Sequence, residues 1–453
     1  PRPGWVEHDP ERIWHSVVQG IQEVSLQYSL RGLQAIGITN QRETLVLWEP
    51  QNQKPLHPAI VWQDRRTQGA LEKLKKKNWE KKIQARTGLL LDPYFSASKL
   101  QWLLQQNPTW KKRDLACGTI DTYILAKLTQ GRAHATDVSN ASRTMLMDLK
   151  SLQWSDELCR LFQVPAHFLP QILPSNASFG VTRAVPGLPD GVPITGILGD
   201  QQAALFGQGA WSEGDAKCTF GTGSFVLLNT GKKLVRSKSR LLSTLAWQLQ
   251  GADPVYALEG GAFVCGAAVQ WLRDSLKIIH NSSEVEALAR SVSDSEGVIF
   301  VPALAGLGAP HWVPQARACL LGLTRGSTSA HIARATLEAM ALQNVELFRA
   351  MEKDTGKRMR RLRVDGGACA NSMLMQMQAD YSGLRLQRPK DLESTTRGAF
   401  LMAALGAGLA SAGDLKKYLD LDQEFIPQLS PKERQKKLEQ WTWAVRSLIA
   451  HSR

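Results

Sequence analysis

The sequence of 453 residues has few cysteines and no long hydrophobic segment, and both shortages limit what the protein can be. Its six cysteines are spread evenly without a C-x-x-C pair, so neither a disulfide framework nor a zinc site is predicted. An uncharged stretch rich in Gly and Ala, 398–413, is shorter than the roughly 20 residues that a membrane helix needs. The first residues do not show the pattern of a signal peptide. Free thiols in a reducing compartment fit this pattern, which predicts a cytoplasmic protein without membrane insertion.

Four common catalytic motifs are also absent from the sequence. It contains no G-x-x-x-x-G-K-[ST], no G-x-G-x-x-G after a strand, no H-E-x-x-H and no G-x-S-x-G. The main sequence evidence is therefore missing for four classes of protein: P-loop NTPases, Rossmann dehydrogenases, zincins and α/β-hydrolases.

The charge is basic without being extreme. There are 55 Lys and Arg against 41 Asp and Glu, a net charge of +14, and 43% of the residues are hydrophobic, as in ordinary globular proteins. The basic excess lies in short clumps with few aromatic residues between them, at 73–82, 111–113, 232–240, 357–363 and 432–437. Such clumps are typical of solvated helix ends and loops, with a nucleic-acid surface as the alternative. We therefore predict no nucleic-acid partner.

The order of predicted elements indicates an α/β protein, and its length favours two domains. Asp9-Pro-Glu11 has the N-cap and first-turn residues of a helix, which the periodicity extends over 10–28. Ser430-Pro-Lys-Glu433 predicts a capping box at the start of a final amphipathic helix. A buried strand over 192–198 and another over 362–365 each end near an aspartate, Asp200 or Asp365. Open α/β sheets bind ligands at the carboxyl ends of their strands. Asp200 is thus a candidate for chemistry, although it is equally suited to cap a helix that begins at Gln201.

A hairpin with a glycine-rich tip is predicted over 217–230. Its tip, Gly221-Thr-Gly223, exposes backbone N–H groups and a hydroxyl that can contact phosphate oxygens. Glycines also precede the helices predicted to start near Val264 and Asn371, and helix N-termini opened by glycine favour anions. Turn geometry alone is the alternative explanation for these glycines.

Several sequence blocks together carry a resemblance to a known family. They are Gly4-Trp-Val-Glu-His-Asp-Pro10, Gly37-Ile-Thr-Asn-Gln-Arg-Glu43, Ile60-Val-Trp-Gln63, Asp92-Pro-Tyr-Phe-Ser96, Gly199-Asp-Gln-Gln-Ala-Ala-Leu-Phe-Gly207, Phe220-Gly-Thr-Gly223 and Arg363-Val-Asp-Gly-Gly367. In this order, and over nearly the whole chain, the sequence resembles the FGGY family of carbohydrate kinases, and within it the members that phosphorylate glycerol. The resemblance implies two actin-like (RNase H-like) α/β domains with a cleft between them. It places the substrate side in residues 1–207 and the nucleotide side in residues 208–453.

The activity that the resemblance implies is the transfer of the γ-phosphoryl group of ATP, with Mg²⁺, to a terminal hydroxyl of glycerol. The product would be sn-glycerol 3-phosphate, and the family makes a homodimer or homotetramer plausible. The family's first domain should open with a hairpin that carries an Asp for the metal and a Gly-Thr-Thr tip, and this sequence does not contain it. Two alternatives therefore stay open, a catalytically inactive actin-like scaffold and a sibling FGGY kinase for another sugar.

The resemblance assigns roles to residues on both sides of the cleft. For the substrate it implies hydrogen bonds from Arg42, Glu43 and Tyr94, carbon contacts from Trp62 and Phe225, a general base in Asp200 and a binding role for Gln201. For ATP it implies Thr222, Gly266, Gln270, Gly367 and Asn371. None of these residues is assigned to a metal. Without the resemblance, the Arg42–Glu43 dipeptide could be a surface ion pair, and Trp62 and Tyr94 could be core aromatics. Arg397 stands where the family usually has a small residue.

Overall fold

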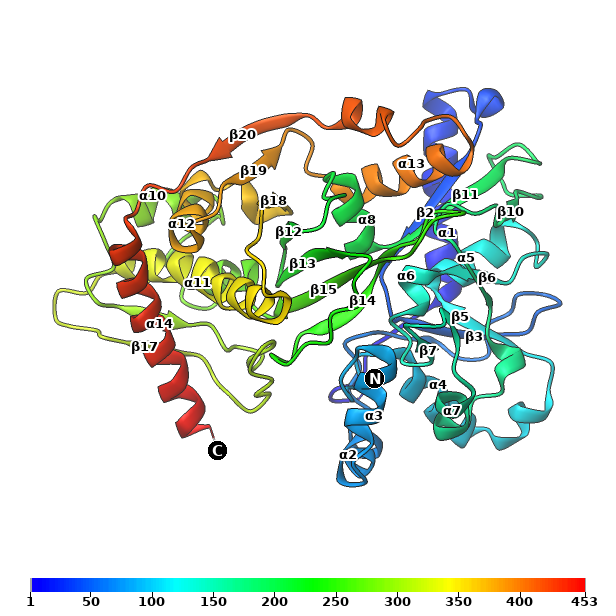
Figure 1. Ribbon diagram of the computed structural model, residues 1–453, viewed down its shortest axis with the longest axis horizontal. Coiled ribbons are helices and arrows are strands. Elements are labelled where there is room, and N and C mark those ends of the chain that lie inside the picture. Colours follow the sequence, from blue (N-terminus) through cyan, green and yellow to red (C-terminus); the bar gives the residue numbers. More distant parts are fainter. Residues whose placement is uncertain (1, 453) are drawn as a thin grey trace.

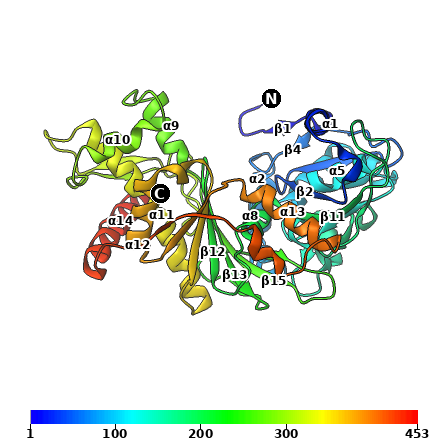
Figure 2. The same cartoon turned by 90° about the horizontal axis from the view of Figure 1, so that it is seen from above.

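The computed structural model describes residues 2–452, which form two lobes side by side (Figures 1 and 2). The N-terminal lobe contains the strands β1 (Glu7–His8), β2 (Ile36–Asn40), β3 (Leu45–Trp48), β4 (Ala59–Ile60), β5 (Ala116–Thr119), β6 (Ala135–Asp137), β7 (Met147–Asp148), β8 (Gln153–Trp154), β9 (Gln171–Leu173), β10 (Gly180–Val181) and β11 (Pro193–Gly199). Its helices are α1 (Pro10–Gln27), α2 (Gln68–Lys76), α3 (Trp79–Thr87), α4 (Ser96–Gln106), α5 (Ile120–Leu128), α6 (Val138–Ala141), α7 (Asp156–Phe162) and α8 (Asp200–Gly207), with short 3₁₀ turns at Leu30–Gly32, Pro108–Lys112 and Ala166–Phe168.

The C-terminal lobe is built around one larger sheet. Its strands are β12 (Asp215–Phe220), β13 (Ser224–Gly231), β14 (Leu242–Trp247), β15 (Val255–Ala262), β16 (Ile299–Val301), β17 (Cys319–Leu321), β18 (Arg361–Asp365), β19 (Leu386–Pro389) and β20 (Leu421–Phe425). Its helices are α9 (Gly266–Asp274), α10 (Glu284–Arg290), α11 (Ser329–Thr355), α12 (Ser372–Ser382), α13 (Ser394–Gly406) and α14 (Pro431–His451), with 3₁₀ turns at Gly367–Ala370 and Asp414–Tyr418.

The local signals in the sequence produce the helix ends that they predict. The Asp9 carboxylate accepts a hydrogen bond of 2.9 Å from the Glu11 N–H, and α1 begins at Pro10. At α14 the Ser430 N–H donates to the Glu433 carboxylate at 2.9 Å while the Glu433 N–H donates back to the Ser430 hydroxyl. The helix predicted over 10–28 and the capping box at 430–433 are therefore confirmed.

The seven-stranded sheet of the C-terminal lobe has the order β14-β15-β13-β12-β18-β19-β20. The predicted hairpin is confirmed, because β12 and β13 pair antiparallel from Ala216 opposite Leu228 to Phe220 opposite Ser224. On its other side β12 runs parallel to β18, and Thr219 lies opposite Asp365. The hairpin tip and the end of β18 thus lie at the same edge of the sheet.

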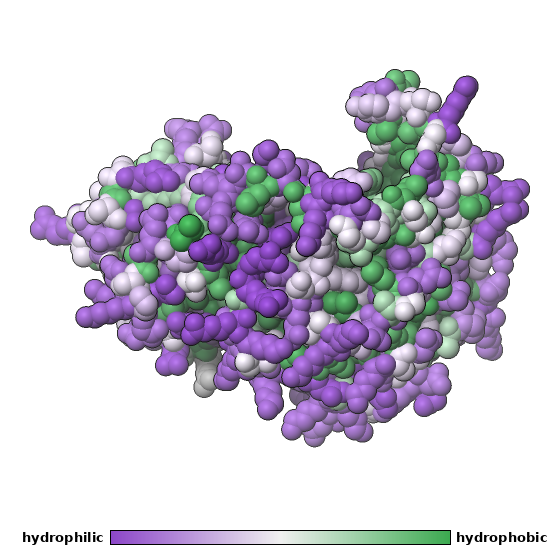
Figure 3. All heavy atoms as spheres, turned by 45° about the horizontal axis from the view of Figure 1, so that its top comes forward, coloured by the Kyte–Doolittle hydropathy of each residue, from purple (hydrophilic) through white to green (hydrophobic). Residues whose placement is uncertain are grey.

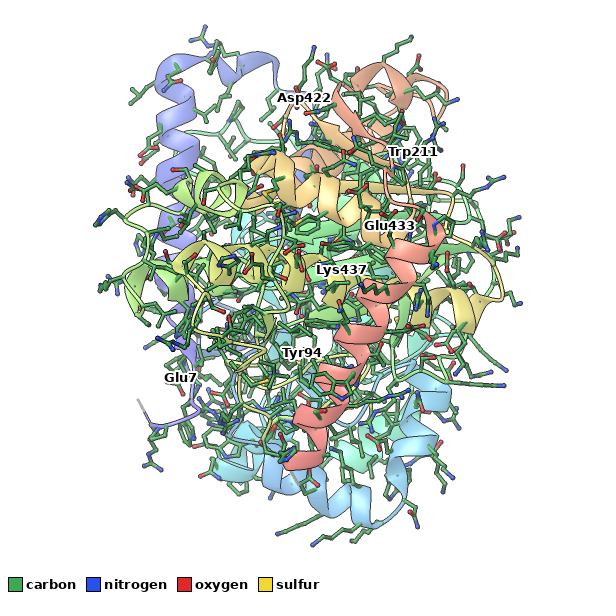
Figure 4. The ribbon with its side chains drawn as sticks, turned by 90° about the vertical axis from the view of Figure 1, so that its left-hand side faces the viewer. Glu7, Tyr94, Trp211, Asp422, Glu433 and Lys437 are labelled. Carbon is green, nitrogen blue, oxygen red and sulfur yellow. The ribbon has the colours of Figure 1, made fainter. Side chains whose placement is uncertain are left out.

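The long helix α11 packs on this sheet and buries most of its residues. α14 packs on α11 and α12, and it crosses in the foreground of Figure 4, where Glu433 and Lys437 are labelled. The Lys437 ammonium lies 3.0 Å from the Glu338 carboxylate of α11. This ion pair joins the two helices beside their apolar contacts.

The lobes meet along α8 and α13, which lie between them in Figure 2. Although α13 follows β19 in the chain, it packs on α8, β11 and β2 of the N-terminal lobe. Glycines allow the close approach. A Cβ added at Gly398 would lie 1.9 Å from the Ala203 carbonyl oxygen, and one at Gly37 would lie 2.3 Å from the Ala399 carbonyl oxygen. We call this contact the glycine seam; it comprises Gly37, Gly196, Gly207, Gly398 and Gly406.

Replacing Gly398 by alanine should destabilise the protein by about 3 kcal/mol, because the new methyl group meets backbone atoms that cannot rotate away. Gly69→Ala is the matched control, since Gly69 lies in helix α2 with open space around it and alanine is the better helix former. Chemical denaturation measures both changes. An unchanged free energy of unfolding for Gly398→Ala would contradict a tight seam.

Three further properties of the molecule concern its thiols, its helices and its surface. All six cysteines are free, as predicted. Among residues 2–452, no helix combines the length and the apolar character needed to cross a membrane. Hydrophilic residues cover most of the face drawn in Figure 3, and its outline is indented between the two lobes.

Candidate functional site

Asp200 lies where the lobes meet, at the carboxyl end of β11. It is the first residue of α8, with Gly199 in the N-cap position, so the helix begins one residue earlier than the capping interpretation predicted. Its Oδ1 accepts hydrogen bonds from the Gln201 N–H at 2.7 Å and lies 3.0 Å from the Arg42 Nε. The side chain keeps 34% of its surface exposed. Both contacts involve Oδ1, so Oδ2 is left to interact with a ligand.

Arg42 belongs to a buried network of four charged side chains from both lobes. Its guanidinium donates to both oxygens of Glu259 on β15, at 2.6 and 3.1 Å. Arg143 donates to Glu259 at 2.9 Å and to Glu43 at 2.6 Å. All four side chains are at most 2% exposed. The surface-pair interpretation of Arg42 and Glu43 is therefore wrong, because both are buried within the joint between the lobes.

The pKa values of the two carboxylates in this network are shifted in opposite directions. Burial alone would raise the pKa of Glu259, but the charges of Arg143 and Arg42 outweigh it and lower that pKa to about 2. Burial raises the pKa of Glu43, whose attraction to Arg42 and Arg143 only partly offsets the loss of water. Glu259 is therefore the firmly ionised member.

Glu43 also has an unusual backbone. Its φ of 60° lies in the left-handed region, which a residue with a side chain rarely adopts. The Ser96 hydroxyl donates to its carbonyl oxygen at 3.0 Å, and Arg143 holds its carboxylate. Strain of this kind, roughly 1–3 kcal/mol, concentrates at functional sites.

Two aromatic side chains lie beside this network. The rings of Trp62 and Tyr94 meet edge to face with centroids 5.3 Å apart, and both residues are half-buried. Burial, together with the charge of Glu43, raises the pKa of the Tyr94 phenol, so the group is a neutral donor at ordinary pH. Tyr94 packs against the core of the N-terminal lobe, as the core interpretation predicts, but neither ring is fully buried.

Lys99 fixes the segment that carries Tyr94. Its buried ammonium donates to the carbonyl oxygens of Pro93 at 2.7 Å, Tyr94 at 2.6 Å and Phe95 at 3.2 Å. Burial lowers the pKa of Lys99 to about 7, although nearby carboxylates oppose the shift. The backbone position of Tyr94 thus depends on the side chain of Lys99, five residues further along the chain.

One of the predicted substrate-side residues, the aromatic Phe225, belongs to the C-terminal lobe and lies where the two lobes meet. Phe225 is half-buried and lies opposite Gly261 in the pairing of β13 with β15. A Cβ added at Gly261 would lie 3.0 Å from the Phe225 ring. Glycine at this position therefore allows the ring to lie across the neighbouring strand.

A buried lysine of the C-terminal lobe contacts the substrate-side candidate Gln201. Lys217 on β12 donates to the Gln201 side-chain oxygen and, at 2.7 Å, to the Thr219 hydroxyl. Burial lowers the pKa of Lys217, while the charges of Asp365 and Asp200 raise it. The Asp365 Oδ1 is buried and has no partner among the described residues. The charges of two carboxylates, at the ends of β11 and β18, therefore act on one buried ammonium.

The hairpin tip docks onto the N-terminus of α9. The carbonyl oxygen of Gly221 accepts from the Gly266 N–H at 2.9 Å, and that of Thr222 accepts from the Cys265 N–H at 2.8 Å. A Cβ added at Gly266 would lie 2.8 Å from the Gly221 oxygen, so this glycine has a packing role. The Thr222 residue itself is exposed at the tip.

The other nucleotide-side candidates surround the same edge of the sheet. Gln270 is exposed on α9, and Gly367 is exposed in the turn after β18 with open space where a Cβ would be. Asn371 caps α12, since its side-chain oxygen accepts from the Leu374 N–H at 2.8 Å. All these residues follow strand ends of the C-terminal lobe.

Four buried residues of this site were not predicted from the sequence: Arg143, Glu259, Lys217 and Lys99. A buried charge leaves little trace in a sequence, because Lys, Arg and Glu are usually exposed. The clearest available signal was Glu259 within an otherwise apolar β-rich run, Val255–Ala262.

Comparisons with known proteins agree with this geometry. The family model for the N-terminal domain of the FGGY family of carbohydrate kinases matches residues 1–207, and that for its C-terminal domain matches residues 216–407. The chain is 57% identical over 452 residues to a glycerol kinase of Bdellovibrio bacteriovorus, covering 98% of this chain and 91% of the relative. It is 50% identical to a glycerol kinase of Myxococcus xanthus at the same coverage.

Solved structures give the same result for the fold. The crystal structure of Plasmodium falciparum glycerol kinase with ADP aligns with a TM-score of 0.94 at 37% identity, covering 99% of this chain and 91% of that one. A xylulose kinase from Lactobacillus acidophilus, 22% identical, aligns with a TM-score of 0.89 over 99% of this chain and 91% of that one, and shares the fold.

The fold and the site define a two-domain phosphotransferase of the actin-like class, and the predicted fold class is confirmed. The chain belongs to the FGGY family of carbohydrate kinases.

Proposed function

We propose that this protein transfers the γ-phosphoryl group of ATP to a terminal hydroxyl of glycerol, giving sn-glycerol 3-phosphate. The observation that carries the proposal is the Asp200 carboxylate, partly exposed at a strand end and fixed by Arg42 through Oδ1 alone. The glycerol kinases to which the chain is 57% and 50% identical support glycerol as the acceptor.

Asp200 acts as the general base in this proposal. Its free Oδ2 accepts the proton of the attacking hydroxyl as the oxygen bonds to phosphorus, an effect worth roughly 10²- to 10⁴-fold in rate. Gln201 binds the substrate beside it and is oriented by the Lys217 ammonium. Lys217 also supplies positive charge next to the reacting groups.

The remaining polar groups select a small triol. Arg42 and Glu43 bond the hydroxyls away from the reaction, and the neutral Tyr94 phenol donates a further hydrogen bond. Trp62 and Phe225 contact the carbon chain from opposite lobes. A site built from buried, directed polar groups rejects molecules that lack a matching hydroxyl, because its own groups would then lose their partners.

ATP binds on the C-terminal lobe in this proposal. Thr222 contacts phosphates at the exposed hairpin tip, and Gly266, Gln270, Gly367 and Asn371 surround the phosphates, ribose and adenine. The open space at Gly367 supports a close approach of the nucleotide to the backbone.

Mg²⁺ fits the carboxylates at this edge. The residues described contain no cluster of three or more metal-ligating side chains, but Mg²⁺ in kinases uses one or two carboxylates together with the phosphates. Asp365, with its buried and unpartnered Oδ1, is the residue that would hold the ion. When bound, Mg²⁺ neutralises charge on the phosphates.

The proposal is tested by a coupled assay of ADP release with glycerol, dihydroxyacetone and a pentulose as acceptors. The chain is assayed as it stands and with the family's Asp-x-Gly-Thr-Thr hairpin fused ahead of residue 1. We expect turnover with glycerol. Glycerol binding without ADP release from either preparation would favour the inactive scaffold, and preference for the pentulose would favour a sibling sugar kinase.

Gly266→Ala should raise the KM for ATP about tenfold with little change in the KM for glycerol, because the added methyl group displaces the hairpin tip. Gly367→Ala tests for a direct clash with the nucleotide, because its added methyl group has no protein atom within 4 Å. A raised KM for ATP in Gly367→Ala would therefore indicate that the methyl group contacts the bound nucleotide. Steady-state kinetics with both substrates varied measures these changes, and an unaltered KM in both variants would contradict the assigned ATP site.

Three broader assignments belong to the same proposal. The domains are residues 1–207 on the substrate side and 208–453 on the nucleotide side. The six free thiols support a cytoplasmic location. We further propose a homodimer or homotetramer, which light scattering after size-exclusion chromatography would measure.

A further inference from the structure

Three arginines line a pocket that the proposed reaction does not use. The pocket has a volume of about 190 Å³ and is lined by Arg361 and Arg363 of β18 and by Arg397 of α13, together with Gln208, Leu419 and Asp420 among others. Arg397 is the residue that departs from the family pattern. Three guanidinium groups beside one carboxylate make the lining strongly positive.

One of the three arginines in this pocket has no partner among residues 2–452, whereas the other charged groups are paired. Arg361 is paired with Asp215 at 3.1 Å, Arg397 lies 3.2 Å from Asp391, and the Asp420 carboxylate lies 3.2 Å from Lys390. The Arg363 guanidinium has no ion pair or hydrogen bond within residues 2–452, and its Nε is buried without a partner. Arg363 is half-buried, so its unpaired charge lowers the stability of the fold unless an anion compensates it.

A second buried group in the pocket also lacks a partner. Gln208, at the end of α8, is only 2% exposed, yet neither its side-chain nitrogen nor its oxygen has a hydrogen-bond partner in the part of the chain that the structure describes. Buried amides are nearly always satisfied, so an unsatisfied one calls for a missing partner. The amide and the Arg363 Nε therefore provide two unused donors beside the same space.

The position of the pocket separates it from the candidate active site. Arg363 lies opposite Lys217 in the pairing of β18 with β12, two residues before Asp365 and on the same face of the sheet. Asp200 begins α8 and Gln208 follows its last residue, a separation of about 12 Å at 1.5 Å per residue. One short helix thus has the proposed base at one end and this pocket at the other.

We propose that this pocket binds a phosphate group, either as inorganic phosphate or as the end of a small phosphate monoester. Guanidinium groups match phosphate geometry through paired N–H donors, and the neutral amide donates without adding charge. The volume is below the roughly 300 Å³ at which pockets for larger ligands begin, which favours a small anion.

Calorimetry and thermal unfolding with the full chain test this proposal. Inorganic phosphate and methyl phosphate are titrated separately against sodium chloride at equal ionic strength, so the two arms distinguish free phosphate from an ester. Both should be tested on the wild type, Arg363→Met, Gln208→Leu and Arg397→Gln. Arg358→Gln is the matched control, because Arg358 is exposed and does not line the pocket.

We expect phosphate to raise the Tm of the wild type and of Arg358→Gln equally. The affinity should fall at least tenfold in Arg363→Met and Gln208→Leu, since each loses a donor to the anion. In chloride alone, both variants should be as stable as the wild type or more so, because each removes an unsatisfied buried group. The proposal is overturned if calorimetry detects no binding by the wild type at millimolar phosphate. It is equally overturned if all pocket variants keep the wild-type affinity.

Discussion

Asp200→Asn should lower kcat for glycerol phosphorylation by about 10²- to 10⁴-fold, while the KM for glycerol changes little. The amide keeps the size of the carboxylate but cannot take the proton of the attacking hydroxyl. Folding should be preserved, because Arg42 retains its bonds to Glu259 and Gln202 when the Asp200 charge is lost. Steady-state kinetics and thermal unfolding measure both effects in the preparation that shows turnover.

The control for this substitution is Asp253→Asn, which removes an exposed carboxylate paired only with Lys232 at the surface. It should leave kcat unchanged. A variant Asp200→Asn with near-normal kcat would show that another group accepts the proton, and the assignment of Asp200 as the base would then fail.

Glu259→Gln should lower the free energy of unfolding by about 3–5 kcal/mol. The substitution leaves two guanidinium groups, Arg42 and Arg143, buried with only Glu43 and Asp200 nearby. It should also lower activity, because Arg42 then loses the partner that fixes its position against Asp200. Urea denaturation measures the first effect and the ADP assay the second. Asp253→Asn again serves as the control and should leave the unfolding transition unchanged.

The same residue predicts how stability responds to acid. The pKa of Glu259 is about 2 in the folded protein, against an ordinary value near 4.5. Its charge therefore contributes stability that is fully present above about pH 4.5 and is lost as the pH falls toward 2. Glu43, with a raised pKa, contributes in the opposite sense. The free energy of unfolding of Glu259→Gln should fall less steeply below pH 4.5 than that of the wild type, and parallel profiles would contradict the ionised network.

The features predicted from the sequence are those fixed by neighbouring residues. The cap at Asp9, the capping box at Ser430 and the hairpin around Gly221-Thr-Gly223 each depend on a few consecutive residues, and each is present in the structure. The order of such blocks was enough to indicate the family and its two actin-like domains.

The buried charge network could not be predicted in this way. Glu259 is 217 residues from Arg42 and 116 residues from Arg143, so no local pattern joins them. Arg42 and Glu43 were found only through the family resemblance, and as isolated residues they suggested a surface pair. The function of a charged residue depends on its burial, which tertiary packing decides.

The glycine seam also affects how the chain can be divided. Residues 394–406 form α13, which belongs to the C-terminal half of the sequence but packs on β2 and β11 of the other lobe. A polypeptide that stops at residue 207 therefore lacks a layer of its own sheet, and the remaining polypeptide carries that layer without its support. We therefore expect that neither half of the chain folds independently. A recombination event that exchanges one half between related proteins would preserve the fold only if α13 moved together with the lobe that it covers.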